Sequence, residues 1–260
     1  MQSHLQKYKY LFFIFVVISF FGKPVSAQFS TKDDVHLFQA FFRDATSSTE
    51  PYGAGAVSYL DYEGAGIFDI GAQGGWGITP NFELSAGLFY RSINRDEPKG
   101  GFFVDENNDD SGIADLPVFG RYIFVNERQT KFAGGAFITL PIGSEDIGEG
   151  NANFGFFGAV RHALNRQVVL TGSLGLDFLE IGEDRETSLN LTAGAIITAA
   201  EKLNIIPELT IQSETDYMAL SGSADYQISS NAHLKGAILL GVDDGAPDFG
   251  ITGGVLFYFL

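Results

Sequence analysis

Charged side chains recur inside segments that otherwise alternate between apolar residues and small or polar ones. They fall on the polar side of the alternation, and they are Asp69, Glu83, Arg91, Asp115, Arg121, Lys131, Arg161, Asp177, Glu208, Asp225 and Lys235. If these segments are strands in a membrane, a lysine or arginine facing the hydrocarbon midplane would cost roughly 2–4 kcal/mol, so we expect the whole set to line an enclosed lumen. Because both signs occur, we predict cross-strand pairing and no strong selection for ions of one sign.

Histidines give a weaker indication of chemistry. His36, His162 and His233 follow the N-terminal region, and none has a serine motif nearby in the sequence. A His-Ser-Asp constellation assembled across strands would make a lipid-modifying hydrolase, which stays open as an alternative. Anchoring at a membrane interface is the interpretation we favour. We therefore expect no catalytic residue and no enzyme.

The acidic run 105–110 resembles a calcium loop only in its oxygen-rich composition. It lacks the glycine at the sixth position and the glutamate at the twelfth position of an EF-hand. We expect a solvated loop, no specific metal site and no cofactor. Glycine-rich stretches at 53–55 and 71–75 have neither the spacing nor the following helix of a nucleotide loop, so nucleotide binding is rejected.

The first residues have the three-part pattern of a secretory signal peptide. Lys7 and Lys9 precede an apolar run from Leu11 to Phe21, and Val25-Ser26-Ala27 offers small residues at a cleavage site. The run is too short to be a membrane-spanning helix. We expect residues 1–27 to be removed and the remainder to be exported.

Composition narrows the class of protein further. The formal charge of −16 argues against nucleic acid as a partner, and the absence of cysteine excludes disulfides. Glycine (32 residues) and phenylalanine (25 residues) are abundant, although no later segment is long and apolar enough for a membrane helix. An exported chain of this kind indicates strands.

Period-2 alternation runs from Tyr52 to the C-terminus. It predicts strands at 52–62, 66–77, 81–92, 112–125, 130–142, 152–163, 167–180, 187–200, 203–214, 216–228, 232–242 and 248–260. The even number, the strand lengths and the alternation of short turns with longer acidic loops are typical of outer-membrane barrels. We predict an all-β fold, a closed antiparallel up-and-down transmembrane β-barrel of 12 strands over residues 52–260.

Aromatic residues divide between the expected wall and the expected lumen. Phe89, Phe119, Phe137 and Phe157 are lumen candidates, and girdle candidates near strand ends are Trp76, Phe82, Tyr90, Tyr122, Phe124, Tyr217 and Tyr226. Ordinary β-propensity explains the second set equally well. The last strand alternates Phe249, Ile251, Val255, Phe257 and Phe259, and so resembles the signal that the barrel assembly machinery reads, with Leu260 in place of the usual terminal phenylalanine.

Residues 28–51 do not share the strand pattern. Val35, Leu37, Phe38, Phe41 and Phe42 form an apolar cluster among polar residues. The segment is interpreted as periplasmic or lumenal, and the sequence leaves open an amphipathic helix, an extension or a segment folded into the lumen. We favour an ordered element packed at the periplasmic mouth.

One part of the chain resembles a known family. Ser111-Gly112-Ile113-Ala114-Asp115-Leu116, then Gly120-Arg121-Tyr122, then Leu140-Pro141-Ile142-Gly143 are similar to the "G-x-x-D-L … K/R-Y … L-P-x-G" signature of outer-membrane proteins related to the MetA-pathway phenol-degradation family. The clear match covers about 35 residues. The resemblance implies an outer-membrane channel for small organic molecules, with Asp115 and Pro141 as structural markers near strand ends.

Together these features predict a porin-like protein of the outer membrane of a Gram-negative bacterium that passes small organic solutes, hydrophobic or aromatic ones among them. The expected partners are those solutes, outer-membrane lipids, lipopolysaccharide bridged by divalent cations, and the assembly machinery. A mixed lumen wall suits a narrow or partly plugged channel. The alternative is a filled, non-conducting barrel that acts as a scaffold or as an adhesin through its acidic loops.

Overall fold

The computed structural model describes residues 30–46, 48–95, 110–181 and 184–259. The predicted signal peptide and most of the acidic run 105–110 lie outside the described residues. Within the described residues, no helix is long and apolar enough to cross a membrane. The strands are β1 (Tyr52–Tyr62), β2 (Ala65–Thr79), β3 (Phe82–Arg95), β4 (Asp110–Ile113), β5 (Leu116–Asn126), β6 (Thr130–Leu140), β7 (Phe154–Ala163), β8 (Val168–Ile181), β9 (Asp184–Ala200), β10 (Leu203–Gln212), β11 (Tyr217–Ser229), β12 (Ala232–Gly241) and β13 (Phe249–Tyr258).

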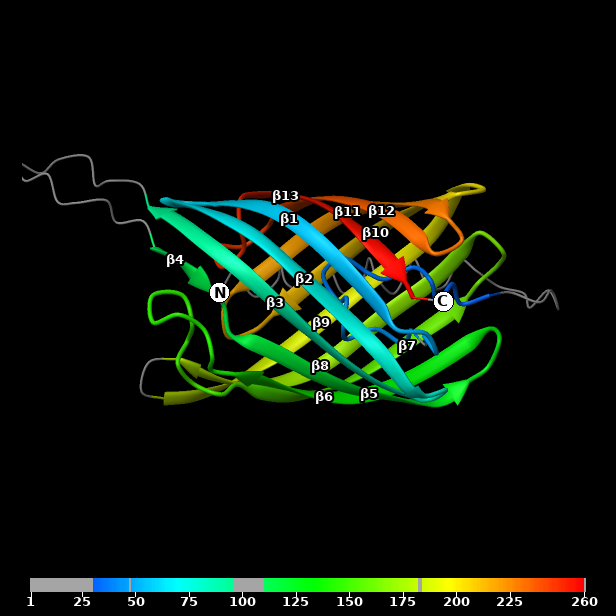
Figure 1. The fold of residues 1–260 in the computed structure, drawn as a ribbon, viewed down its shortest axis with the longest axis horizontal. Coiled ribbons are helices and arrows are strands. Elements are labelled where there is room, and N and C mark those ends of the chain that lie inside the picture. The colour runs from blue at the N-terminus through cyan, green and yellow to red at the C-terminus, as the bar shows by residue number, and fades with distance from the viewer. Residues whose placement is uncertain (1–29, 47, 96–109, 182–183, 260) are drawn as a thin grey trace, which may run out of the picture.

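The strands form one closed antiparallel barrel (Figure 1). Successive strands pair with each other except β4 with β5, and β1 pairs with β13 from Tyr52 opposite Tyr258 to Asp61 opposite Phe249, which joins the first strand to the last. Both β4 and β5 pair with β3, one beyond the other, so they occupy a single position in the wall. The predicted closed barrel of 12 strands is therefore confirmed, with one strand interrupted.

The interruption falls at Ala114 and Asp115, inside the predicted strand 112–125. The Asp115 carboxylate accepts hydrogen bonds from the backbone amides of Gly143 and Glu149, both at 2.8 Å. Ser144 donates its amide to the Ile113 carbonyl at 2.8 Å, and its hydroxyl accepts from the Ile113 amide at 2.9 Å. The residues of the "G-x-x-D-L" and "L-P-x-G" motifs thus hold the loop after β6 against the broken strand.

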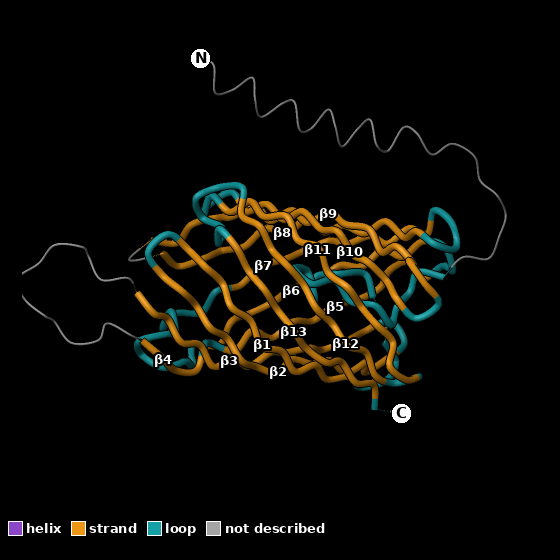
Figure 2. The backbone as a smooth tube through the Cα atoms, turned by 90° about the horizontal axis from the view of Figure 1, so that it is seen from above, coloured by secondary structure: helices purple, strands orange, loops and turns teal. Residues whose placement is uncertain are grey.

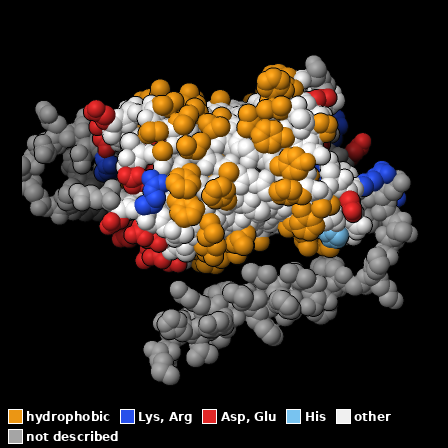
Figure 3. All heavy atoms as spheres, turned by 90° about the horizontal axis from the view of Figure 1, so that it is seen from below, with side chains coloured by type: hydrophobic (Ala, Val, Ile, Leu, Met, Phe, Trp, Pro, Cys, Tyr) orange, Lys and Arg blue, Asp and Glu red, His pale blue; other side chains and the backbone are white. Residues whose placement is uncertain are grey.

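Alternation along the strands separates an apolar outer face from a polar inner face. Large apolar side chains are exposed along the outside of the wall, and charged side chains gather toward its two ends (Figure 3). Burying such a surface is favourable by about 25 cal/mol per Å², so a belt of this extent indicates a surface that is covered by apolar material.

The N-terminal segment fills the barrel interior. Residues 30–46 and 48–51, which we call the plug, run as irregular chain inside the strands (Figures 1 and 2). At the rim with the short turns, Lys32 Nζ donates to Asn204 Oδ1 at 2.9 Å. Toward the opposite rim, Phe38 packs on Ala219, Leu239 and Ala246. We favoured an element packed at the periplasmic mouth. The plug instead extends from one rim through most of the lumen.

Candidate functional site

Arg161 on β7 is the most strongly engaged side chain in the lumen. Its Nε donates to Asp44 Oδ1 at 2.8 Å and its Nη2 donates to Asp44 Oδ2, so the guanidinium grips the carboxylate with two parallel bonds. The three remaining bonds go to the carbonyls of Thr31 (3.1 Å), Lys32 (2.7 Å) and Val35 (2.7 Å). Arg161 and Asp44 are both 0% exposed. All five donors of this arginine are thus used on the plug.

Two neighbouring wall residues complete the surroundings of Asp44. Thr171 Oγ1 on β8 donates to Asp44 Oδ1 at 2.9 Å, and Arg121 Nη1 on β5 donates to the Asp44 carbonyl at 2.8 Å. Arg121 Nη2 also lies 2.6 Å from Glu83 Oε1, which accepts the hydroxyl of Tyr52 at 2.7 Å. The Arg121 charge is therefore balanced by the wall itself.

A second group of contacts holds the plug backbone at residues 36–39. The Glu208 carboxylate on β10 accepts the amides of Phe38 at 2.6 Å and Gln39 at 2.9 Å. Lys235 Nζ on β12 donates to the His36 carbonyl at 2.7 Å. Because both wall residues bind main-chain atoms, they hold this turn whatever its side chains are.

Two ion pairs attach the plug along β6 and β8. Lys131 Nζ lies 2.5 Å from Asp33 Oδ2, and Arg43 Nη1 lies 2.8 Å from Asp177 Oδ2. Gly175 on β8 faces the same space, because a Cβ there would come 3.2 Å from Arg43 Nη1. The absence of a side chain at this position leaves room for the arginine.

His36 sits in the middle of the plug among aromatic rings. Its ring stacks on Phe41 with centroids 4.6 Å apart and lies 4.7 Å from the Tyr52 ring. Burial, with the nearby charges of Lys235, Arg121 and Arg161, lowers the pKa of His36 well below its ordinary value. The imidazole is therefore neutral where it packs.

The predicted lumen residues have three different surroundings. Those bound to the plug are Arg121, Lys131, Arg161, Asp177, Glu208 and Lys235. Those paired within the wall are Asp69 with Arg91 (2.8 Å), Glu83 with Arg121, and Asp225 with His233 (2.7 Å). Asp115 belongs to neither group, because its carboxylate holds the loop after β6.

His162 lies apart from the two interior histidines, His36 and His233, whose rings both lie near the Tyr258 ring. His233 pairs with Asp225 in the interior. His162 follows the inward-facing Arg161 on β7, so it lies on the other side of the wall, where its ring is hydrogen-bonded to the Thr130 hydroxyl at 2.8 Å. Interior and exterior histidines on opposite sides of a sheet do not form one constellation.

The aromatic residues follow the alternation. Phe119, Phe137 and Phe157 are buried inside, and Phe89 lines an interior cavity. Trp76, Tyr90, Tyr122, Phe124 and Tyr226 are exposed on the outside. The prediction of Tyr217 as a girdle residue is wrong, because its hydroxyl points inward and lies 3.3 Å from Gln39 Oε1. Tyr217 lies on the same side of β11 as Asp225, eight positions later, as alternation along the strand requires.

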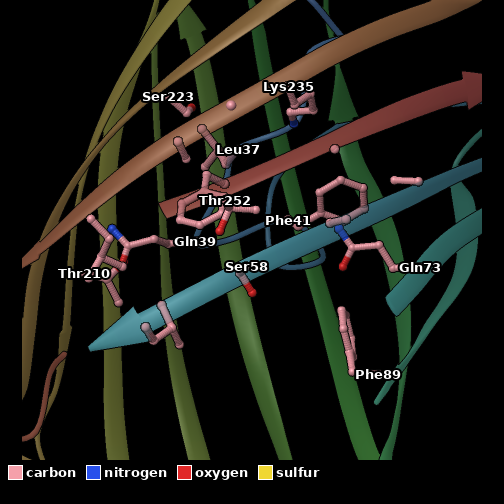
Figure 4. Close-up of a pocket in the computed structure, with 18 of the residues that line it drawn as sticks. Leu37, Gln39, Phe41, Ser58, Gln73, Phe89, Thr210, Ser223, Lys235 and Thr252 are labelled. Carbon is pink, nitrogen blue, oxygen red and sulfur yellow. The ribbon is translucent and has the colours of Figure 1, made fainter. Parts of the chain in front are cut away.

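A cavity of about 290 Å³ remains between the plug and the wall on the side of β1, β12 and β13. Leu37, Phe41 and the amide of Gln39 form its plug side (Figure 4). The wall side combines small residues of β1, β12 and β13 with larger ones, which include Leu60, Gln73, Phe89, Gln212, Tyr217, Lys235 and Leu239. A 150 Å³ apolar cavity already admits benzene, so this space is sufficient for a small organic molecule.

Sequence reasoning missed the plug's own functional residues. Asp33, Arg43 and Asp44 lie in a segment without periodicity, and their partners are 98 to 134 positions away along the chain. The one usable signal was the unusual density of charge inside apolar strands, since buried charges need partners.

Comparisons with known proteins bear on the fold. No protein-family model and no curated protein matches the sequence. The COG4313 outer membrane channel from Pseudomonas putida F1 is similar with a TM-score of 0.64 at 12% identity, over 84% of this chain and 98% of that chain. The fold is one that outer-membrane channels use. The KdgM porin is similar with a TM-score of 0.56 at 13% identity, over 80% and 99% of the two chains. The Ralstonia pickettii toluene transporter TbuX has a TM-score of 0.50 at 10% identity, over 83% and 79%. The named resemblance to the MetA-pathway family stays a prediction.

Proposed function

We propose that this protein is an outer-membrane channel for small organic solutes whose lumen is closed at rest by its own N-terminal segment. The observation that carries the proposal is the polar attachment of the plug. Arg161, Glu208, Lys235, Lys131 and Asp177 hold it through hydrogen bonds and ion pairs. Well-packed apolar residues are usually as good as buried ion pairs for stability alone, so a filler with no other role would not need this interface.

The polar contacts between the plug and the wall can be replaced by contacts with water. If the plug leaves, each wall charge can be rehydrated, whereas an apolar wall would resist wetting. The channels and transporters that share the fold include proteins whose names refer to toluene and to a complex with oligogalacturonate. These names support passage of organic molecules without identifying the solute here.

The remaining expectations fit the same proposal. The exposed apolar belt would contact outer-membrane lipids, the acidic loops would meet lipopolysaccharide through divalent cations, and the short turns would face the periplasm. Phe249, Ile251, Phe257 and Phe259 lie exposed in alternation on the last strand, where the assembly machinery would read them.

A filled lumen also favours the second candidate, a non-conducting scaffold or adhesin. Conductance in planar bilayers separates the two candidates. We expect the full-length protein to be mostly closed, and a full-length Arg161→Met/Glu208→Gln variant and a variant lacking residues 30–46 to show steady channels. If both variants insert as folded barrels and neither conducts, the channel proposal is wrong and the scaffold stands.

A further inference from the structure

The wall supplies an anion to other arginines of the inner face but not to Arg161. Arg91 is paired with Asp69 and Arg121 with Glu83, both on neighbouring strands. Arg161, by contrast, has Asp44 of the plug as its ion-pair partner, and within the described residues all its hydrogen bonds end on plug residues. The barrel therefore carries a buried cation whose counter-charge is on a segment that our proposed function requires to move.

The surroundings of the Asp44 carboxylate have the form of a ligand site. Two parallel bonds come from Arg161 and a third from Thr171 Oγ1 at 2.9 Å. All three donors are wall side chains, so they stay in place when the plug leaves. Planar, two-point recognition is the geometry in which arginine binds carboxylates best.

We infer that Arg161 and Thr171 form a carboxylate-binding site of the lumen, which Asp44 occupies in the closed barrel and which the carboxylate of a small organic acid takes when the plug moves. A solute carboxylate that binds Arg161 and Thr171 competes with Asp44 for the same donors, so it favours the state in which the plug is released. The solute class that follows is small organic acids. The solute part rests on the proposed channel function, whereas the site itself does not.

The concentration of free acid that is needed to displace Asp44 can be estimated. Asp44 is tethered, and a short tether gives an effective concentration in the mM range. A free acid must therefore reach concentrations on the order of mM to displace it. Replacing Asp44 with a neutral residue removes the competitor and lowers the concentration needed.

The site is tested first without any transport measurement, by chemical rescue of full-length Asp44→Ala in detergent micelles. We expect this variant to melt earlier than the wild type, and sodium acetate to raise its melting temperature. Acetamide, and sodium chloride at the same ionic strength, should not. In Asp44→Ala/Arg161→Met the acetate effect should disappear, while in Asp44→Ala/Arg166→Met, changed at an exposed turn, it should remain. Equal effects of acetate and chloride, or rescue of the Arg161 double variant, would overturn the site.

The solute class is tested by single-channel recording with benzoate and its neutral counterpart, benzyl alcohol. Benzoate should raise the open probability of the full-length protein and benzyl alcohol should not. Asp44→Asn should lower the benzoate concentration for half-maximal opening roughly tenfold, and Arg161→Lys, which keeps charge without the two-point grip, should raise it. If the barrel without residues 30–46 conducts but benzoate and benzyl alcohol act alike, the organic-acid inference fails and the channel stands. If acetate rescues Asp44→Ala but no variant conducts, the carboxylate site stands and the channel fails.

Discussion

The two sides of the plug differ in how they meet the wall. Toward β6, β7 and β8 the contact is made by Lys131, Arg161, Thr171 and Asp177, which bind named plug atoms. Toward β1 and β13 the plug contacts Tyr52 and Tyr258 near one end of these strands, and beyond them lies the 290 Å³ cavity. The plug therefore fills the lumen toward β6, β7 and β8 and leaves space along part of β1 and β13. In the proposed channel, this arrangement would combine a closed lumen with space beside the plug.

Removing the main anchor should have the largest effect. Arg161→Met leaves Asp44 buried without its cation, which should weaken plug docking by about 3–5 kcal/mol. Trypsin cleavage after Arg43 in the folded barrel measures this directly, because that arginine is accessible only when the plug is out. Arg166→Met, at the exposed turn between β7 and β8, should leave the cleavage rate unchanged. Equal cleavage rates in the Arg161 variant and the wild type would mean that the polar side does not anchor the plug.

Glu208→Gln should have a smaller effect of the same kind. The amide side chain keeps an acceptor for one plug amide but loses the charge-assisted bonds to Phe38 and Gln39, and we expect a loss of about 1.5–3 kcal/mol. Hydrogen exchange at the amides of Phe38 and Gln39 should accelerate, while strand amides of β10 should not change. Acceleration spread evenly over β10 would instead indicate damage to the barrel.

Acid should loosen the plug through His36. Because the docked state lowers the pKa of His36, the undocked plug binds the proton more readily, and docking is fully stable only above the ordinary pKa of about 6.5. Below that value, docking should weaken by up to about 1.4 kcal/mol per pH unit. His36→Phe should remove this part of the pH dependence of trypsin cleavage. A pH profile unchanged by the substitution would assign the dependence to other groups.

Filling the cavity beside β1 should change the stability of plug docking least and the conductance of the released barrel most. Ala56→Phe on β1 projects into the cavity, where free volume accommodates the ring, so we expect plug docking to change by less than about 1 kcal/mol. In the plug-released Arg161→Met/Glu208→Gln background the same substitution should reduce conductance. Val57→Phe, one position along and exposed on the outside, is the matched control and should not. If both substitutions reduce conductance equally, the path does not follow the cavity.

Much of the wall could be predicted because alternation is a local property. Val169 and Ile206 lie on the side of their strands that carries the charged residues, and they are buried in one cluster with Val35 and Leu37 of the plug. The break at Asp115 could not be predicted, because the amides that its carboxylate accepts belong to a loop 28 and 34 positions away. Tyr217 was named as a girdle candidate for its place near a strand end, although its even spacing from Asp225 places it on the inner side.

The sequence by itself determined the closed barrel and which side of each strand carries charge, because a strand places successive side chains on opposite faces whatever its neighbours are. Only the tertiary structure decided which acid each buried cation takes. Arg121 is paired within the wall, whereas Arg161 is paired with a segment 117 positions earlier in the chain. A buried charge requires a partner, but the identity of that partner depends on which chain segment enters the lumen, and no local pattern encodes it.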